Sequence, residues 1–193
     1  TVLGTSDDFI ADSLGLQWQW HGNSKEDWYS LKSEGGLRLN AVSFGNDQPL
    51  RLWELPNLLL QKFHAPEFSA TTKVSFNPKG EGEQAGLAVM GIDYAYLALN
   101  QEQDRFKLRY NLGSEKREQD QEISQVLLEQ NTVYLKVGVS EGAVCSFSYS
   151  LDNKTFVQMG EDFQAKKGKW IGAKVGLFCQ GTAHTATEPG SAN

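Results

Sequence analysis

Hydrophobic and polar residues alternate one by one along most of the chain. Between positions 68 and 76, residues Phe68, Ala70, Thr72, Val74 and Phe76 fall on one side, and polar residues lie between them. A period of two is typical of a strand with one buried and one exposed face. By this criterion, strands are expected at 16–20, 28–32, 37–40, 58–63, 68–76, 86–91, 94–99, 106–110, 133–139, 144–150 and 174–179.

The stretches between these runs are rich in glycine, asparagine and proline, which mark turns. No segment of about a dozen residues has a convincing period of 3.6, so helix should be minor. Ten or more short strands exceed what one twisted open sheet holds comfortably, which leaves two packed sheets or a closed barrel. We therefore predict an all-β fold, a two-sheet antiparallel β-sandwich over residues 1–180. The small polar residues 181–193 are predicted to form a loop or truncated tail.

The length of the chain and its net charge argue against some classes of function. The 193 residues suit one domain, and no apolar run approaches the roughly 18 residues of a membrane span. Lys plus Arg number 18 against 24 Asp plus Glu, a net charge of −6, and no basic stripe offers itself to phosphates. The sequence therefore predicts no membrane and no nucleic-acid partner. Because the chain opens at Thr1 without Met, we expect a removed leader or a fragment of something longer.

The two cysteines and three histidines show no pattern that indicates a metal site or a catalytic site. Cys145 and Cys179 both lie in apolar strand-like runs, so they are either buried free thiols or one disulfide. His21, His64 and His184 show no metal-ligand pairing and no neighbouring nucleophile pattern. Neither a transition-metal site nor a Ser-His-Asp triad is predicted.

An acidic cluster, Glu118, Asp120 and Glu122, has its members two residues apart. On a strand, this spacing puts all three carboxylates on one face. The pattern is similar to the E-x-D-x-E signature of family 16 glycanases, in which paired carboxylates act as nucleophile and acid/base. The alternative is a charged surface strand or loop, which the neighbouring Lys116 and Arg117 favour.

Aromatic side chains are the residues best suited to contact a sugar, because the apolar faces of pyranose rings pack on exposed aromatic rings. Trp53 and Trp170 are each bordered by turn or charged residues, so exposure at an edge of the sandwich is expected. Tyr94 and Tyr96 share a face opposite Ala95, and the pattern does not decide whether that face is buried. A stand-alone carbohydrate-binding module would need Trp53, Tyr94 and Tyr96 exposed along one face.

Several short motifs occur together in a characteristic order. The chain resembles the C-terminal β-sandwich of bacterial family 43 glycoside hydrolases, the β-xylosidase and α-L-arabinofuranosidase family, which has a concanavalin A-like jelly-roll fold. The motifs that carry the resemblance are DDF at 7–9, LGLQWQW at 14–20, WYSL at 28–31, GLRL at 36–39, PNLLLQ at 56–61, AGLAVM at 85–90, DY at 93–94, FSYSLD at 147–152 and GAKVGLF at 172–178.

The resemblance implies a non-catalytic accessory domain. In that family, a separate β-propeller of the same polypeptide holds the catalytic acids, and the sandwich packs against it. An aromatic residue just before a Gly-x-x-Val-Gly strand commonly reaches the rim of the propeller's active site, and Trp170 occupies that position here. The implied substrates are xylan- or arabinan-derived sugars of plant cell walls, and the implied location is periplasmic or extracellular.

The resemblance also implies features near the end of the chain. Family members usually close with a further strand, and residues 191–193 lie about where that strand would begin. An acidic residue of that strand helps the residue at the position of Asp8 hold a structural calcium in related sandwiches. Calcium is therefore a candidate ligand through Asp8, and no other cofactor is required.

Overall fold

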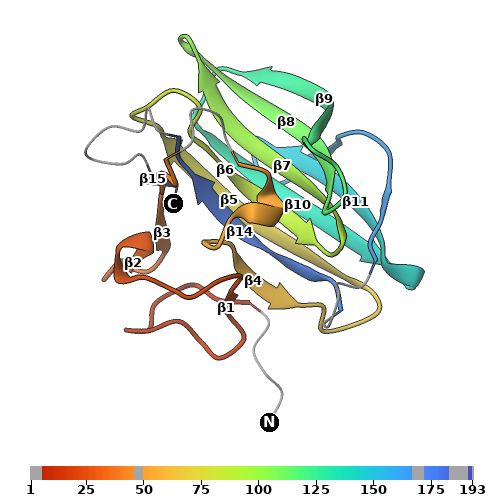
Figure 1. Ribbon diagram of the computed structural model, residues 1–193, viewed down its shortest axis with the longest axis horizontal. Coiled ribbons are helices and arrows are strands. Elements are labelled where there is room, and N and C mark those ends of the chain that lie inside the picture. The colour runs from red at the N-terminus through yellow and green to blue at the C-terminus, as the bar shows by residue number, and fades with distance from the viewer. Residues whose placement is uncertain (1–5, 46–49, 167–171, 183–190, 193) are drawn as a thin grey trace.

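Two antiparallel sheets packed face to face form the molecule, as the computed structural model shows for residues 6–45, 50–166, 172–182 and 191–192 (Figure 1). The predicted all-β sandwich is confirmed. In spatial order, the seven-stranded sheet consists of β1 (Gln19–Trp20), β4 (Leu59–Lys62), β14 (Lys174–Gln180), β6 (Gln84–Met90), β7 (Asp93–Glu102), β8 (Arg105–Ser114) and β9 (Gln121–Leu128). The second sheet consists of β12 (Val157–Gln158), β11 (Val144–Ser150), β10 (Thr132–Ser140), β5 (Phe68–Asn77), β15 (Ser191–Ala192), β3 (Leu37–Asn40) and β2 (Tyr29–Leu31), with β13 (Phe163–Gln164) beside β11.

Helix is minor, as predicted. The described residues contain three single-turn 3₁₀ helices, η1 (Glu26–Trp28), η2 (Leu52–Glu54) and η3 (Glu141–Ala143). None of the helices in the described ranges has the length and apolar character that a membrane crossing requires.

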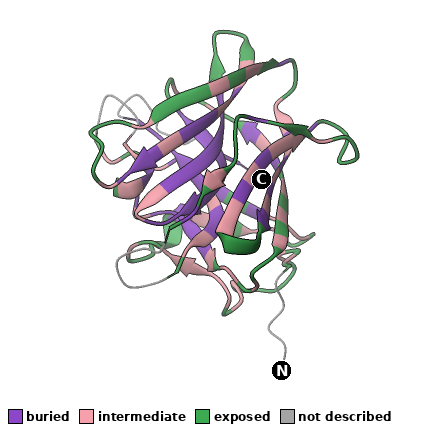
Figure 2. Ribbon diagram, turned by 90° about the vertical axis from the view of Figure 1, so that its right-hand side faces the viewer, coloured by how far each residue is buried: buried purple, intermediate pink, exposed green. Residues whose placement is uncertain are grey.

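The main core lies between the two sheets and follows the alternation of the sequence. Val133, Leu135 and Val137 of β10 are fully buried and belong to one cluster with Leu97 and Leu99 of β7. Figure 2 shows buried residues running along the strands, with exposed residues gathered mainly in the loops. Burying apolar surface between the sheets supplies the main driving force for this fold.

A second apolar cluster covers the outer face of the seven-stranded sheet, the face turned away from the other sheet. It brings Leu52, Leu55 and Leu58 of residues 50–58, here called the cover segment, against Tyr96 of β7 and Phe178 of β14. In Figure 1, η2 of this segment lies in front of the sheet. The central strands of the sheet are therefore buried on both faces.

Strand β9 was missed by the sequence pattern, as were the two-residue strands β12 and β13. Most side chains of β9 are exposed, and Leu128 at its end is the one buried residue among its eight. An edge strand with so little burial leaves only a weak alternation of hydrophobic and polar positions.

Strand β15 lies in the stretch predicted to be a loop or tail. Ser191 pairs with Asn40 of β3 on one side and with Asn77 of β5 on the other, and Ala192 continues both pairings. Within residues 181–193, the structure therefore adds a short strand to the predicted loop.

Both cysteines are buried free thiols, so the disulfide alternative is wrong. Burial raises the pKa of the Cys145 thiol to about 11 and also raises the pKa of Cys179. Because the thiolate is the reactive form, neither cysteine is a nucleophile at neutral pH.

Candidate functional site

Two buried tyrosines of β7 share one carboxylate on the outer face of the seven-stranded sheet. The Tyr94 hydroxyl donates to Oδ1 of Asp120 at 2.5 Å, and the Tyr96 hydroxyl donates to Oδ2 at 3.0 Å. The backbone N–H of Leu52 also donates to Oδ2, at 3.3 Å. Asp120 therefore ties the cover segment to the sheet through the two tyrosines.

Burial of these tyrosines changes their expected role. Tyr94 is 0% exposed and Tyr96 is 4% exposed, so neither ring presents a face on which a sugar could stack. A Cβ at Gly113, which pairs with Tyr94, would lie 2.1 Å from the Tyr94 ring and 2.4 Å from Oδ1 of Asp120. Only glycine leaves room for this arrangement. The aromatic platform that a stand-alone sugar-binding module would need does not form from these residues.

The environment keeps both tyrosines neutral. Burial raises the pKa of Tyr94 far above its ordinary value, and the hydrogen bond to Asp120 and the negative charge of Asp120 add to the effect. Burial also raises the pKa of Tyr96, again reinforced by Asp120. An ionised phenolate here would be desolvated beside a carboxylate.

The three acids of the E-x-D-x-E pattern do not share a strand face. Strand β9 begins at Gln121, so Glu122 alone lies in the strand, while Glu118 and Asp120 belong to the preceding bend. The expectation of three carboxylates aligned on one strand was wrong, because the charged residues 115–120 form the connection between β8 and β9. Asp120 serves as an anchor for two tyrosines.

A polar hollow of about 510 Å³ nevertheless opens beside this anchor, next to the cover segment. We call it the polar pocket. It is lined by residues from four strands of the sheet and from the bend, chiefly Gln84, Tyr96, Arg109, Asn111, Asp120 and Glu122. Glu118 also lines it, so all three acids reach the same space.

Arg109 crosses the floor of the polar pocket. It lies on β8, and its Nη2 donates to Oε1 of Gln84 on β6 at 3.2 Å. Ala98 of β7 pairs with Arg109 and Gly86, and these small residues leave the outer surface of β7 open for the guanidinium. On its other side, Nη1 lies 3.8 Å from Oε2 of Glu122.

The residues Gln84 and Arg109 were missed by the sequence pattern. A signal existed: Gln84 and Gln180 are polar residues at the ends of apolar runs, and they pair in register. Nε2 of Gln84 donates to Oε1 of Gln180 at 2.7 Å, and both side chains are buried. Polar positions aligned across neighbouring strands would have indicated a polar site on the outer face.

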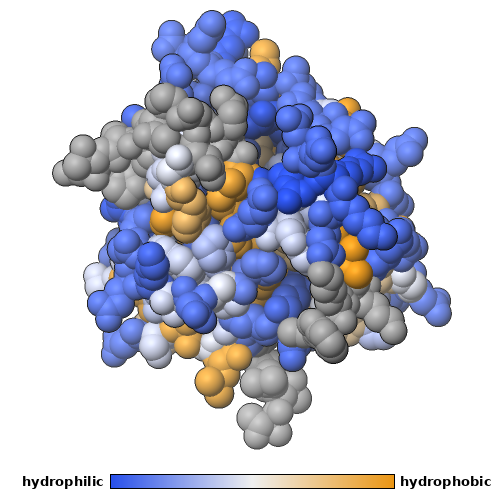
Figure 3. Space-filling view, in the orientation of Figure 1, coloured by the Kyte–Doolittle hydropathy of each residue, from blue (hydrophilic) through white to orange (hydrophobic). Residues whose placement is uncertain are grey.

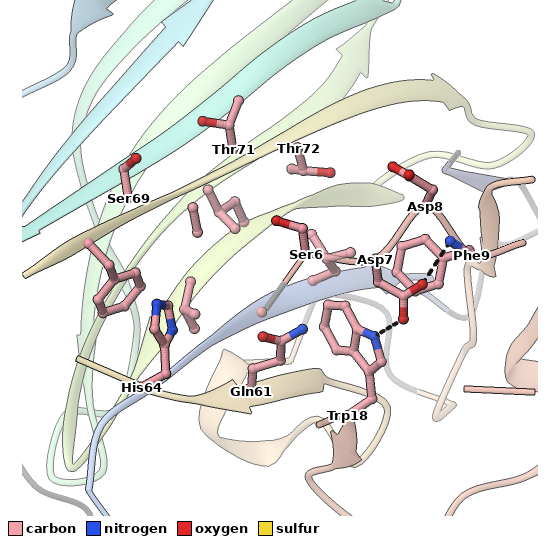
Figure 4. A pocket seen from close by; sticks show the side chains of 16 residues that line it. Ser6, Asp7, Asp8, Phe9, Trp18, Gln61, His64, Ser69, Thr71 and Thr72 are labelled. Carbon is pink, nitrogen blue, oxygen red and sulfur yellow. Dashed lines mark hydrogen bonds between the residues drawn. The ribbon is translucent and has the colours of Figure 1, made fainter. Parts of the chain in front are cut away.

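A second hollow, of about 360 Å³, runs between the sheets where β5 faces β4 and β14 (Figure 4). The N-terminal segment closes one end through Asp7. Its Oδ2 accepts from Nε1 of Trp18 at 2.8 Å and Nε2 of Gln17 at 3.0 Å, and its Oδ1 accepts from the N–H of Phe9 at 2.8 Å. Figure 4 shows the Trp18 ring beside this carboxylate. Asp7 is thus fully engaged in holding the segment.

Asp8, the predicted calcium ligand, lies beside Asp7 on this hollow and is exposed. Calcium takes six to eight oxygen ligands, usually including several carboxylates. No group of three or more His, Cys, Asp or Glu side chains that could hold a metal occurs in the described part of the chain. The calcium at Asp8 therefore stays a prediction.

Trp53 lies in η2 of the cover segment, packs on the outer apolar cluster and is half-buried. Its ring meets the exposed His21 edge-on, with 6.1 Å between ring centroids. Partial burial, and then the charge of Lys174 at the start of β14, lower the pKa of His21. The other described histidine, His64, packs on Phe68, with 4.5 Å between the centroids of the two rings. His184 lies outside the described residues.

Trp170 also lies outside the described residues, but its chain neighbours are placed. Before it, Nζ of Lys166 donates to Oδ2 of Asp93 at 2.7 Å, at the start of β7. After it, the Ala173 carbonyl accepts from the N–H of Phe63 at 3.2 Å. These two contacts lie at the start of β7 and just after β4.

The sandwich corresponds to a known family. Residues 6–190 match the model described as the β-xylosidase C-terminal concanavalin A-like domain. The chain belongs to this family. The resemblance drawn from the ordered motifs is thereby confirmed.

Two curated relatives carry enzyme names. A β-xylosidase of Formosa agariphila is 26% identical over 199 residues, which cover 92% of this chain and 32% of the relative. A non-reducing end α-L-arabinofuranosidase of Bacteroides ovatus is 34% identical over 90 residues, 45% of this chain and 16% of the relative. This chain thus spans about a third or less of the length of these curated relatives.

Solved structures show the same fold. A bifunctional GH43-CE protein of Bacteroides eggerthii superposes with a TM-score of 0.81 at 23% identity, over 96% of this chain and 24% of that one. The GH43 BlXynB protein of Bacillus licheniformis superposes with a TM-score of 0.77 at 22% identity, over 96% of this chain and 37% of that one.

We predict that Asp120→Ala destabilises the fold by about 2–4 kcal/mol, because two buried hydroxyls lose their acceptor. Urea unfolding followed by tryptophan fluorescence measures the loss. The control is Glu118→Ala in the same bend, an exposed residue whose loss should change stability by less than about 0.5 kcal/mol. Equal effects of the two substitutions would contradict the anchoring role of Asp120.

We also predict that stability falls as the pH rises above about 10, the ordinary pKa of tyrosine. The unfolded chain releases the protons of Tyr94 and Tyr96 there, while the folded chain retains them, so deprotonation favours unfolding. Tyr94→Phe should make the decline of unfolding free energy between about pH 10 and 12 shallower. Tyr134→Phe, on the other sheet, serves as the comparison. An unchanged slope in Tyr94→Phe would contradict the pKa shift.

Proposed function

We propose that this chain is the non-catalytic accessory domain of a longer family 43 glycoside hydrolase. One observation carries the proposal: the family match extends over nearly the whole chain, whereas the chain accounts for only 32% of the β-xylosidase it resembles. The remaining two thirds of such a polypeptide would hold the catalytic domain, a β-propeller in the family that the motifs resemble. Hydrolysis would take place there.

The acids of this chain support the assignment of catalysis elsewhere. A glycosidase needs one carboxyl group free to donate a proton and a second free to act as nucleophile or base. Asp120 is engaged by two tyrosine hydroxyls and one backbone N–H. This engagement of the central acid does not favour the family 16-like alternative.

The surface around Trp53 is the one we assign to the catalytic domain. The other candidate sugar-contacting residue, Trp170, lies outside the described residues, and its role at the rim is part of this proposal. An indole at the rim of a sugar pocket excludes water from the pocket and narrows its entrance. Such a residue helps position the substrate and takes no part in proton transfer.

The names of the relatives suggest the substrate class. Because they are a β-xylosidase and an α-L-arabinofuranosidase, we assign xylan- or arabinan-derived sugars to the longer enzyme. A periplasmic or extracellular location accompanies polysaccharide substrates. The proposal includes a structural calcium held in part by Asp8, which is exposed.

The proposal predicts that the 193-residue chain alone hydrolyses neither 4-nitrophenyl β-D-xylopyranoside nor 4-nitrophenyl α-L-arabinofuranoside. The natural longer polypeptide should hydrolyse at least one of them. In that polypeptide, Trp170→Ala should raise KM about tenfold with a smaller change in kcat, because a wall of the pocket is lost and the reacting groups remain. Release of 4-nitrophenol, read at 400 nm, follows each reaction. Turnover by the isolated chain, abolished by Glu118→Gln, would overturn the proposal in favour of a family 16-like glycanase.

A further inference from the structure

The polar pocket has the volume of a ligand site. Its lining is polar, whereas the cover segment packs on an apolar part of the outer face. Its volume of about 510 Å³ lies within the range of small-molecule sites. One wall is the cover segment, and the floor consists of side chains from β6, β7, β8 and β9. Figure 3, which views the molecule as in Figure 1, shows a mainly hydrophilic surface with scattered hydrophobic patches.

Rigid groups hold the polar side chains in place. Asp120 is oriented by Tyr94 and Tyr96, and Gln84 is oriented by Gln180, whose Nε2 donates to the Leu50 carbonyl at 2.8 Å. Arg109 in turn donates to Gln84. These side chains are therefore positioned before any ligand arrives, which reduces the entropy lost on binding.

Hydrogen-bonding capacity remains unused in the polar pocket. Nε of Arg109 is buried and has no partner among the described residues. Its Nη1 and Oε2 of Glu122 lie 3.8 Å apart, beyond hydrogen-bonding distance, and the Glu122 side chain is 40% exposed. The amide of Asn111 makes only a long bond, 3.4 Å to the Arg109 carbonyl. The polar pocket therefore has neighbouring hydrogen-bond donors and acceptors that can form further hydrogen bonds.

The charged residues that line the polar pocket indicate which class of ligand it binds. Among the described residues, the polar pocket is lined by four carboxylates, Glu54, Glu118, Asp120 and Glu122, and by two guanidinium groups, Arg51 and Arg109. This excess of negative charge disfavours phosphates, sulfates and acidic sugars. A cation site is not indicated either, since the described acids form no metal-binding group of three or more. A neutral ligand rich in hydroxyl groups satisfies adjacent donors and acceptors at once.

We propose that the polar pocket is a binding site for a neutral oligosaccharide, with Arg109 and Glu122 contacting its hydroxyl groups. The recognition depends on hydrogen bonds from planar polar side chains, because the tyrosines beneath the pocket are buried and offer no stacking surface. This site belongs to the sandwich itself and does not require a catalytic domain. Its test is therefore independent of the hydrolysis test above.

Isothermal titration of the 193-residue chain with xylohexaose, arabinohexaose and cellohexaose tests the proposal. The first two sugars are chosen because of the proposed function, and the third is a neutral oligosaccharide of a hexose. We expect at least one to bind, with affinity reduced about tenfold or more by Arg109→Met, which removes the guanidinium but keeps the aliphatic stem. The matched control is Arg105→Met, at the exposed first residue of β8, with less than a twofold effect.

A second pair of variants covers the case in which Arg109→Met unfolds. Glu122→Ala, whose side chain is partly exposed, should also weaken binding about tenfold, whereas Glu129→Ala, in the exposed turn after β9, should not. Circular dichroism confirms the fold of each variant. Failure of all three sugars to bind, or binding that Glu122→Ala leaves unchanged, overturns the proposal. Tighter binding of hexagalacturonate than of the neutral sugars overturns the neutral ligand class.

Discussion

The burial of the seven-stranded sheet on both faces is the constraint on which the rest of the structure depends. One face packs against the second sheet, as in any sandwich. The other is covered by residues 50–58, whose leucines pack on Tyr94, Tyr96 and Phe178. A segment without strand pairing can remain there only if its polar backbone is satisfied. The Asp120 carboxylate accepts from the N–H of Leu52, the Gln180 side chain donates to the Leu50 carbonyl, and the N–H of Gly22 donates to the Pro56 carbonyl at 2.8 Å.

This cover determines where chemistry is available on the domain. It hides the tyrosines, so the middle of the outer face offers no aromatic platform. It ends beside Arg109 and Glu122, where the sheet surface becomes polar and hollow. It also carries Trp53, whose ring meets His21 next to the edge strand β1. The same nine residues thus separate a hydrogen-bonding pocket from an indole-bearing edge.

The alternation of hydrophobic and polar residues was enough to predict the sandwich, because strands such as β5 and β10 bury one face in the main core. It could not place Tyr94 and Tyr96, since the leucines that cover them are some 40 residues away in the chain and have no strand pattern. Asp120 looked like one of three equivalent acids, and only its tertiary partners distinguish it. Arg109 was missed because a single arginine on a strand is usually solvated. The family, in contrast, was readable from motifs whose order is independent of such contacts.

The mass of the natural polypeptide tests the central claim, that this sandwich is part of a longer glycoside hydrolase. An antibody raised against the 193-residue chain would capture the polypeptide from the organism that makes it, and intact mass spectrometry would weigh it. The account predicts a mass well above the 21.4 kDa of this chain, by at least one further domain of about 100–200 residues. A mass near 21.4 kDa would contradict it and leave a domain that acts alone.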